Sequence, residues 1–376
     1  MTSKTPRPEG DLVNLARLAL AGRPQDVLVY VRRLAKQYRD NAPEIAEALI
    51  GLLRDAPTRS SPLRRGADVA LPVDIDTRFQ LLRIEETPVL DHEPVFSPHV
   101  AASLTRLVEE RTHNAALLEA GLDPTRTTLF TGPPGVGKTM AARWLARSLH
   151  KPLVILDLAA VMSSYLGRTG ANLRHVLDYA KSVDCVLLLD ELDAIAKRRD
   201  DRGEIGELKR LVTVLIQQLD DWPASGLLIA ATNHAELLDP AIWRRFEQIV
   251  EFPLPTAEAA AEFIAAHLSG HSLRAAEWAG ILAVALSGNS FSEIDRDLKA
   301  ARRAAALGGD GLEDSLAALI RPEKLTKQQR IDLATRLVDS ALVSQRRAHD
   351  LTGVARETIR SRTTPQRHTA HKEEQV

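Results

Sequence analysis

The sequence has very little of several things that would point to particular protein classes. Among its 376 residues there is one cysteine, aromatic residues make up 4%, and no apolar run approaches the roughly 18 residues of a membrane helix. A single cysteine excludes a disulfide framework, and no cysteine–histidine cluster has zinc-site spacing. The first ten residues also lack the apolar core of a secretion signal. We therefore expect a cytoplasmic protein.

Net charge is nearly absent too, but the charges are unevenly distributed. The formal total is −1. Residues 1–67 and residues 321–376 each carry 12 basic and 7 acidic side chains, whereas residues 68–320 carry 25 basic and 36 acidic ones. An acidic body with two basic ends suggests separate tasks for the ends, although simple variation of a solvated surface would give the same totals.

The periodicity of apolar residues predicts the domain organisation. Within residues 10–54, apolar side chains recur at helical spacing, which indicates a three-helix unit. Short, nearly continuous apolar runs at 127–132, 152–157, 185–190 and 226–233 are typical of buried parallel strands, with helices at 138–149 and 206–220 between them. After Pro253 the pattern is helical. We expect a helical N-terminal adaptor (1–54), a linker (55–90), an α/β domain (91–253), a helical lid (254–322), a further helical segment (323–364) and a disordered tail (365–376).

The first motif with clear chemistry is GPPGVGKT, which matches G-x-x-x-x-G-K-[ST] between an expected strand and an expected helix. Its backbone N–H groups and the helix N-terminus are suited to cradle phosphate. Lys138 would reach the β- and γ-phosphates of a nucleotide, and the Thr139 hydroxyl would ligate Mg²⁺. The expected nucleotide-binding residues here are Gly132, Pro133, Pro134, Gly135, Val136, Gly137, Lys138 and Thr139.

Two later strands end in polar residues that would complete the site. Asp190 and Glu191 follow the apolar run CVLLL, where Asp190 would hold the Mg²⁺ shell and Glu191 would activate the attacking water. Asn233 ends the next run and can donate to the water or to the γ-phosphate. For Asp193 we expect only a solvated position or a charge at a helix N-terminus.

At this point the chain resembles the AAA family of ATPases within the AAA+ superfamily. GPPGVGKT, LLLDELDAI and IAATNHAELLDPAIWRRFEQIVEFPLP stand in that family's order and approximate spacing, across roughly residues 90–305. The last segment is most similar to the katanin and spastin branch. The resemblance implies a P-loop NTPase fold, in which helices sandwich a parallel sheet and a helical lid follows. It also implies ATP with Mg²⁺ as cofactor and a homo-oligomer, most simply a hexameric ring.

The resemblance also implies roles for residues outside the nucleotide motifs. Arg244 and Arg245 match the family's arginine fingers, which reach the γ-phosphate bound by the neighbouring subunit. Tyr165, Leu166 and Gly167 stand where the family carries its pore loop, which grips an extended polypeptide in the central channel. Arg168 follows them where relatives often have an acidic residue, so the charge preference for substrate is open.

Other positions match the family less closely. His267 matches a histidine near the adenine, but a lone histidine on a helix can equally be structural. The segment SGNSFSEIDRDLKAA lacks the second glycine of the family's G-F-S-G-A-D. Position 293 is a glutamate (Glu293), so the chain has no sensor arginine there, and the katanin and spastin branch also lacks one. The family's acidic-Val-Gly-Gly entry is replaced by EPVFSPHV.

The basic C-terminal end contains a segment, LVSQRRAHDLTGVARETIRSR, that resembles a helix-turn-helix. Gly353 would lie at the turn and Ile359 at the buried position of the second helix. Arg356 and Arg360 would then be candidate DNA contacts. His349, where close packing normally needs alanine, argues against this interpretation. A helical hairpin that caps the lid or binds protein remains open.

Taken together, these residues predict an ATP-hydrolysing, ring-forming motor that remodels or threads protein substrates through a central pore. Two alternatives stay open. One is a DNA-associated ATPase recruited by the C-terminal segment. The other is an ATP-state switch that controls a partner enzyme such as a protease. No feature indicates a membrane partner.

Overall fold

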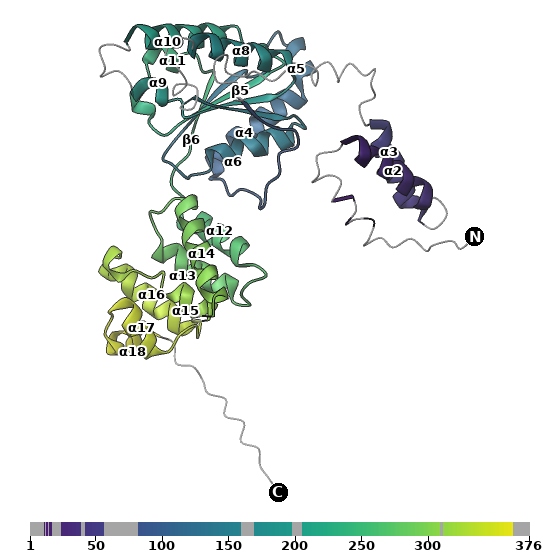
Figure 1. Cartoon of the computed structure of the whole chain (residues 1–376). Coiled ribbons are helices and arrows are strands. Elements are labelled where there is room, and N and C mark those ends of the chain that lie inside the picture. The colour runs from purple at the N-terminus through teal and green to yellow at the C-terminus, as the bar shows by residue number, and fades with distance from the viewer. Residues whose placement is uncertain are drawn as a thin grey trace, which may run out of the picture. The chain divides into compact units, whose positions relative to one another are not determined.

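Nearly continuous apolar strands form the middle layer of an α/β/α arrangement (Figure 1), as the computed structural model shows. The structure describes residues 11, 13, 15–16, 24–38, 42–55, 82–158, 169–197, 205–308 and 311–363. Most of the first expected helix, most of the expected linker, the expected pore loop and the expected tail lie outside these residues. Contacts divide the chain into two units, Met1–Ala70 and Leu71–Val376.

The first unit contains the helices α2 (Pro24–Tyr38) and α3 (Pro43–Asp55). Leu34, Tyr38 and Ala46 form its small core. The carboxylate of Asp11 accepts hydrogen bonds from the hydroxyls of Tyr30 (3.0 Å) and Tyr38 (2.9 Å). Two of the chain's four tyrosines are therefore used to fix this unit internally.

The second unit is built on a six-stranded sheet with the order β1-β3-β4-β5-β2-β6. Its strands are β1 (Leu82–Glu85), β2 (Thr127–Thr131), β3 (Leu153–Asp157), β4 (Val186–Asp190), β5 (Leu227–Thr232) and β6 (Gln248–Glu251). Only β1 is antiparallel to its neighbour; the other pairs are parallel. The mixed, mostly parallel sheet confirms the expected α/β class.

Both faces of the sheet are covered by helices, which is why its central strands are buried and largely apolar. Leu187 and Leu189 of β4 pack into one core, whereas Val186 and Leu188 pack into the other. On the first face lie α8 (Thr169–Ser182) and α10 (Ile205–Asp220), and on the second lie α4 (Pro98–Thr112) and α6 (Lys138–Ser148). The short helices are α5 (Asn114–Glu119), α9 (Ala194–Lys197), η3 (Ala235–Leu237) and α11 (Pro240–Trp243).

The helices after Pro253 form a lid that continues into the C-terminal segment. They are α12 (Ala257–Leu268), α13 (Ala275–Ala285), α14 (Phe291–Ala306), α15 (Leu312–Ala317), η4 (Pro322–Lys324), α16 (Lys327–Asp339), α17 (Gln345–Thr352) and α18 (Arg356–Arg362). One hydrophobic core runs through all of the α-helices among them, from Ile264 of α12 to Ile359 of α18. Because that core is shared, α16–α18 pack as part of the lid. No helix in the described part of the chain is long and apolar enough to cross a membrane.

The connection between α17 and α18 has the local form that the sequence suggested. Gly353 ends α17 with a left-handed backbone (φ 69°), and Ile359 is fully buried. His349 lies at this turn, where its Nδ1 is 2.7 Å from the carbonyl oxygen of Val354. The histidine is therefore accommodated as a side chain that closes the turn. Arg356 and Arg360 are exposed on α18.

Candidate nucleotide site

The loop between β2 and α6 approaches its neighbours too closely for side chains. Gly132 has φ 140°, and a Cβ atom there would lie 2.1 Å from the carbonyl oxygen of Phe252. Gly135 has φ 77°, and a Cβ there would lie 2.7 Å from the Ser290 hydroxyl. The glycines thus let the loop pass between β6 and the lid, and the carbonyl oxygen of Gly135 accepts a hydrogen bond from Ser292 N of α14 (3.1 Å).

The N-terminus of α6 is prepared for an anion. Gly137 caps the helix without any side-chain hydrogen bond, so the first N–H groups of α6 have no side-chain acceptor. Lys138 begins the helix, and its Nζ donates to the carbonyl oxygens of Gly132 (2.6 Å) and Pro133 (2.9 Å) and to Asn233 Oδ1 (2.8 Å). Burial lowers the pKa of Lys138 to about 8, against smaller opposing effects of nearby carboxylates. A phosphate can take the place of these neutral acceptors, because its negative charge makes it a stronger acceptor for the ammonium group.

The second half of the site comes from β4. The Thr139 hydroxyl lies 3.2 Å from Asp190 Oδ2, so the two oxygens that could contact a Mg²⁺ ion are adjacent. Asp190 Oδ1 also accepts a hydrogen bond from Glu191 N (3.0 Å). Glu191 is exposed and has a left-handed backbone (φ 55°), an unusual conformation for a residue other than glycine. That conformation turns the chain sharply where β4 ends.

The end of β5 brings Asn233 to the same place. Its amide oxygen accepts from Lys138, and its backbone N–H donates to Asp193 Oδ1 (3.3 Å). Asp193 precedes α9, but the expectation of a solvated position is wrong, because only 3% of the residue is exposed. Its burial could not be inferred from the motif, since its partner Thr232 is 39 residues away.

A cavity of about 340 Å³ between the loop and the lid contains His267. The ring of His267 lies 4.0 Å from that of Phe263 and 4.3 Å from that of His92, centre to centre. Its Nδ1 is 2.8 Å from the carbonyl oxygen of Phe263, and burial is the main cause that lowers its pKa. The structure thus places His267 beside the phosphate loop, together with His92, for which the sequence had given no signal.

The remaining candidates do not join this cluster. Arg244 and Arg245 follow α11 and are exposed, and the Arg245 guanidinium pairs with Asp220 (3.2 Å). None of the contacts in the described ranges links either arginine to Lys138, Thr139 or Asp190. Glu293 completes a capping box with Ser290 at the start of α14. The side chains expected in the pore loop, Tyr165, Leu166 and Gly167, lie outside the described residues.

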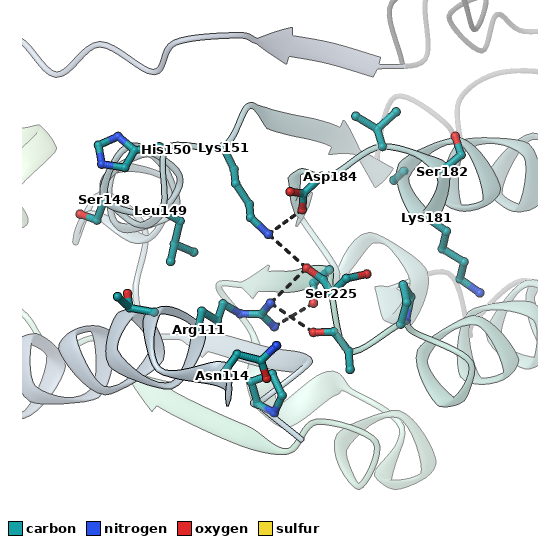
Figure 2. A pocket seen from close by; sticks show the side chains of 17 residues that line it. Arg111, Asn114, Ser148, Leu149, His150, Lys151, Lys181, Ser182, Asp184 and Ser225 are labelled. Atoms are coloured by element: carbon teal, nitrogen blue, oxygen red, sulfur yellow. Dashed lines mark hydrogen bonds and ion pairs between the residues drawn. The ribbon is translucent and has the colours of Figure 1, made fainter. Parts of the chain in front are cut away.

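The opposite end of the sheet carries a second and larger cavity, of about 670 Å³ (Figure 2). Arg111, at the end of α4, donates from Nη2 to the carbonyl oxygens of Thr125 (2.6 Å) and Gly226 (2.8 Å). Its Nη1 lies 3.4 Å from the carbonyl oxygen of Ser225. Lys151 bridges the Asp184 carboxylate (2.6 Å) and the carbonyl oxygen of Ser225 (3.1 Å). Burial lowers the pKa of Arg111 to about 10.

Comparison with known proteins identifies relatives of this chain. Residues 128–254 match the model of the ATPase family associated with various cellular activities (AAA). Over 280 residues the chain is 34% identical to an uncharacterized AAA family ATPase, y4kL, of Sinorhizobium fredii, covering 74% of this chain and 84% of that protein. It is 32% identical over 271 residues to the proteasome-activating nucleotidase of Pyrococcus abyssi, covering 66% of each.

A third relative is matched over less of its length. The chain is 32% identical over 208 residues to the 26S proteasome regulatory subunit 7 of Dictyostelium discoideum, which covers 53% of this chain and about half (49%) of that protein. These relatives do not test the likeness to the katanin and spastin branch, which stays a prediction. They also give no support to DNA binding by Arg356 and Arg360.

Proposed function

The chain belongs to the AAA family of ATPases, and on that premise we propose that it is a ring-forming motor that uses ATP to remodel or thread protein substrates. The ATPase activity follows from membership of the family. The finer statement rests on one observation above all. Lys138, Thr139, Asp190 and Asn233, from three separate segments, meet at the N-terminus of α6 as two hydrogen-bonded pairs, Lys138 with Asn233 and Thr139 with Asp190.

Different residues of the site bind different parts of ATP. The backbone N–H groups of 135–137 and the start of α6 bind the β-phosphate, and Lys138 transfers its hydrogen bonds from the loop carbonyls to the β- and γ-phosphates. Thr139 and Asp190 would hold Mg²⁺, because both offer oxygen ligands and these oxygens are adjacent. When bound, Mg²⁺ neutralises charge that develops on the phosphate oxygens. His267 contacts the adenine.

Hydrolysis is assigned to residues at the ends of β4 and β5. Glu191 accepts the proton of the attacking water, and its exposed position leaves room for that water. Asn233 donates to the γ-phosphate as charge develops. Arg244 and Arg245 act on the nucleotide of the adjacent subunit, which agrees with their exposure and with the lack of described contacts to this chain's own site.

The protein-processing part of the proposal draws on relatives. A proteasome-activating nucleotidase and a 26S proteasome regulatory subunit are both named for proteasomes. By analogy, we assign to this chain a hexameric ring, a protein substrate and a pore loop at Tyr165, Leu166 and Gly167 that grips the substrate. The first unit would then act as the adaptor that recruits substrate or partner.

The variant Glu191→Gln tests the proposal. Loss of the carboxylate should lower ATP turnover by about 10² or more while ATP stays bound, because general-base catalysis contributes that much. Retained ATP should stabilise a hexamer in light scattering, and a pull-down should recover unfolded or partly threaded protein.

Lys138→Ala is the matched control, since it should bind neither ATP nor substrate. Full turnover by Glu191→Gln would remove the assigned role. A single intact enzyme recovered in stoichiometric amount would favour the switch over the motor.

A further inference from the structure

The most deeply buried carboxylate near the nucleotide site belongs to Asp193, which the mechanism above does not use. Asp193 is 3% exposed, two residues after Glu191. Its Oδ1 accepts hydrogen bonds from the Thr232 hydroxyl (3.2 Å) and from Asn233 N (3.3 Å). A buried carboxylate is costly unless its environment compensates it, so its location at the junction of two strands requires an explanation.

These bonds tie together the two segments that carry the hydrolytic residues. Leu192 N donates to the carbonyl oxygen of Ala231 (2.9 Å), beside the contacts of Asp193. The Thr232 hydroxyl that donates to Asp193 also accepts from His234 N (3.1 Å). Residues 192–193 are therefore fixed to residues 231–234 by several bonds, directly after the left-handed turn at Glu191.

The same bonds determine where the Asn233 side chain lies. Asp193 holds the backbone N–H of Asn233, so the Cα–Cβ bond of Asn233 has a fixed direction toward the phosphate loop. The amide oxygen then meets Lys138 Nζ at 2.8 Å.

We propose that Asp193 is a positioning residue that sets Asn233 for ATP hydrolysis and links it to the loop that carries Glu191. The inference rests on the role of Asn233 proposed above. A carboxylate that served only to hold the end of β5 would contribute to folding alone. A positioning carboxylate affects the chemical step through Asn233 and leaves nucleotide affinity largely unchanged.

The test is a double-mutant cycle on the full chain, with kcat, KM for ATP and the Kd of ADP measured together. Asp193→Ala should lower kcat by about 10²-fold, the scale on which small misplacements of catalytic groups act. KM and the Kd of ADP should stay unchanged. Asp193→Asn keeps an oxygen at the Oδ1 position and should recover most of kcat. On the background of Asn233→Ala, removal of Asp193 should lower kcat no further.

Three outcomes would overturn the proposal, and they are distinguishable. If Asn233→Ala leaves kcat unchanged, the role of Asn233 is wrong and this inference falls with it. If Asn233→Ala lowers kcat but the effect of Asp193→Ala adds to it in full, Asn233 keeps its role and Asp193 does not act through it. If Asp193→Ala lowers only the melting temperature, Asp193 is structural. Thr232→Val, which keeps the bond to Asn233 N, should lower kcat much less and serves as control where Asp193→Ala does not fold.

Discussion

The two edges of the sheet in the second unit each place a cation, buried Lys138 or half-buried Arg111, against backbone carbonyl oxygens, but with different consequences. At the carboxyl edge, Lys138 donates to two carbonyl groups of a glycine-rich loop and to Asn233. At the amino edge, Arg111 donates to carbonyl groups of two connecting segments, one before β2 and one before β5 (Figure 2). The difference lies in the groups around each cation.

The direction of the helices explains that difference. Helices on a parallel sheet begin near the carboxyl edge and end near the amino edge, so N–H groups gather at the first and C=O groups at the second. The start of α6 offers donors for an anion, whereas Arg111 at the end of α4 donates to carbonyl groups of the connections that lead into β2 and β5. A cation surrounded by carbonyl oxygens therefore indicates a ligand site only where free N–H groups lie beside it.

Substitution of each cation is the clearest test of this difference, and the largest effect is expected for Lys138→Ala. Two charge-assisted hydrogen bonds to phosphate, at about 1.5–3 kcal/mol each, would be lost. ATP affinity should fall by about 10²–10⁴-fold. The thermal midpoint should stay the same or rise, because a buried ammonium is removed. Titration with a fluorescent ATP analogue and a thermal melt measure both. A lower midpoint with unchanged affinity would assign Lys138 the role that we give to Arg111.

Arg111→Ala should give the reverse result, with a smaller effect. The carbonyl groups of Thr125 and Gly226 would lose a charged, part-buried donor, so the free energy of unfolding should fall by about 2–4 kcal/mol. The ATPase rate per folded molecule should not change. Urea denaturation and the ATPase rate at low denaturant measure these quantities. Arg147→Ala is the matched control, because Arg147 pairs with the exposed Glu93 and should contribute at most about 1 kcal/mol. Equal losses in the two variants would contradict the structural role of Arg111.

The smallest expected effect is a pH dependence that belongs to the carboxyl edge alone. The lowered pKa of Lys138, about 8, means that the free enzyme loses the ammonium proton above that pH. The ratio kcat/KM should therefore fall as pH rises through about 8, approaching tenfold per unit. At saturating ATP the bound phosphates keep Lys138 protonated, so kcat should stay level over the same range. A constant kcat/KM up to pH 9.5 would show that the lysine remains charged in the free enzyme.

Much of the carboxyl edge could be predicted from local sequence. The four strands β2–β5 are continuous apolar runs, and each is found within one residue of its expected start. The edge strands β1 and β6 were missed because they are only four residues long and partly exposed, so they lack such a run. Residues 82–85 had been expected in the linker, but Leu82 is buried against the sheet and pairs with Leu156.

Contacts between distant residues could not be predicted in the same way. The burial of Asp193 depends on Thr232, and the role of Arg111 depends on carbonyl groups more than 100 residues away. His92 lacks any motif, and only the packing of the lid brings it to His267. Sequence motifs can therefore identify the reacting groups, whereas the positions of Asp193, Arg111 and His92 depend on contacts that only the folded structure shows.

The shared core of the lid and α16–α18 has a mechanical consequence. The carbonyl oxygen of Gly135 in the phosphate loop accepts a hydrogen bond from Ser292 N at the start of α14. Helix α14 packs into the same hydrophobic core as Ile359 of α18. A rotation of α14 that follows the nucleotide would therefore swing α18 as the far end of a rigid lever. The exposed Arg356 and Arg360 of α18 would then change position with the nucleotide state, although they lie far along the chain from the phosphate loop.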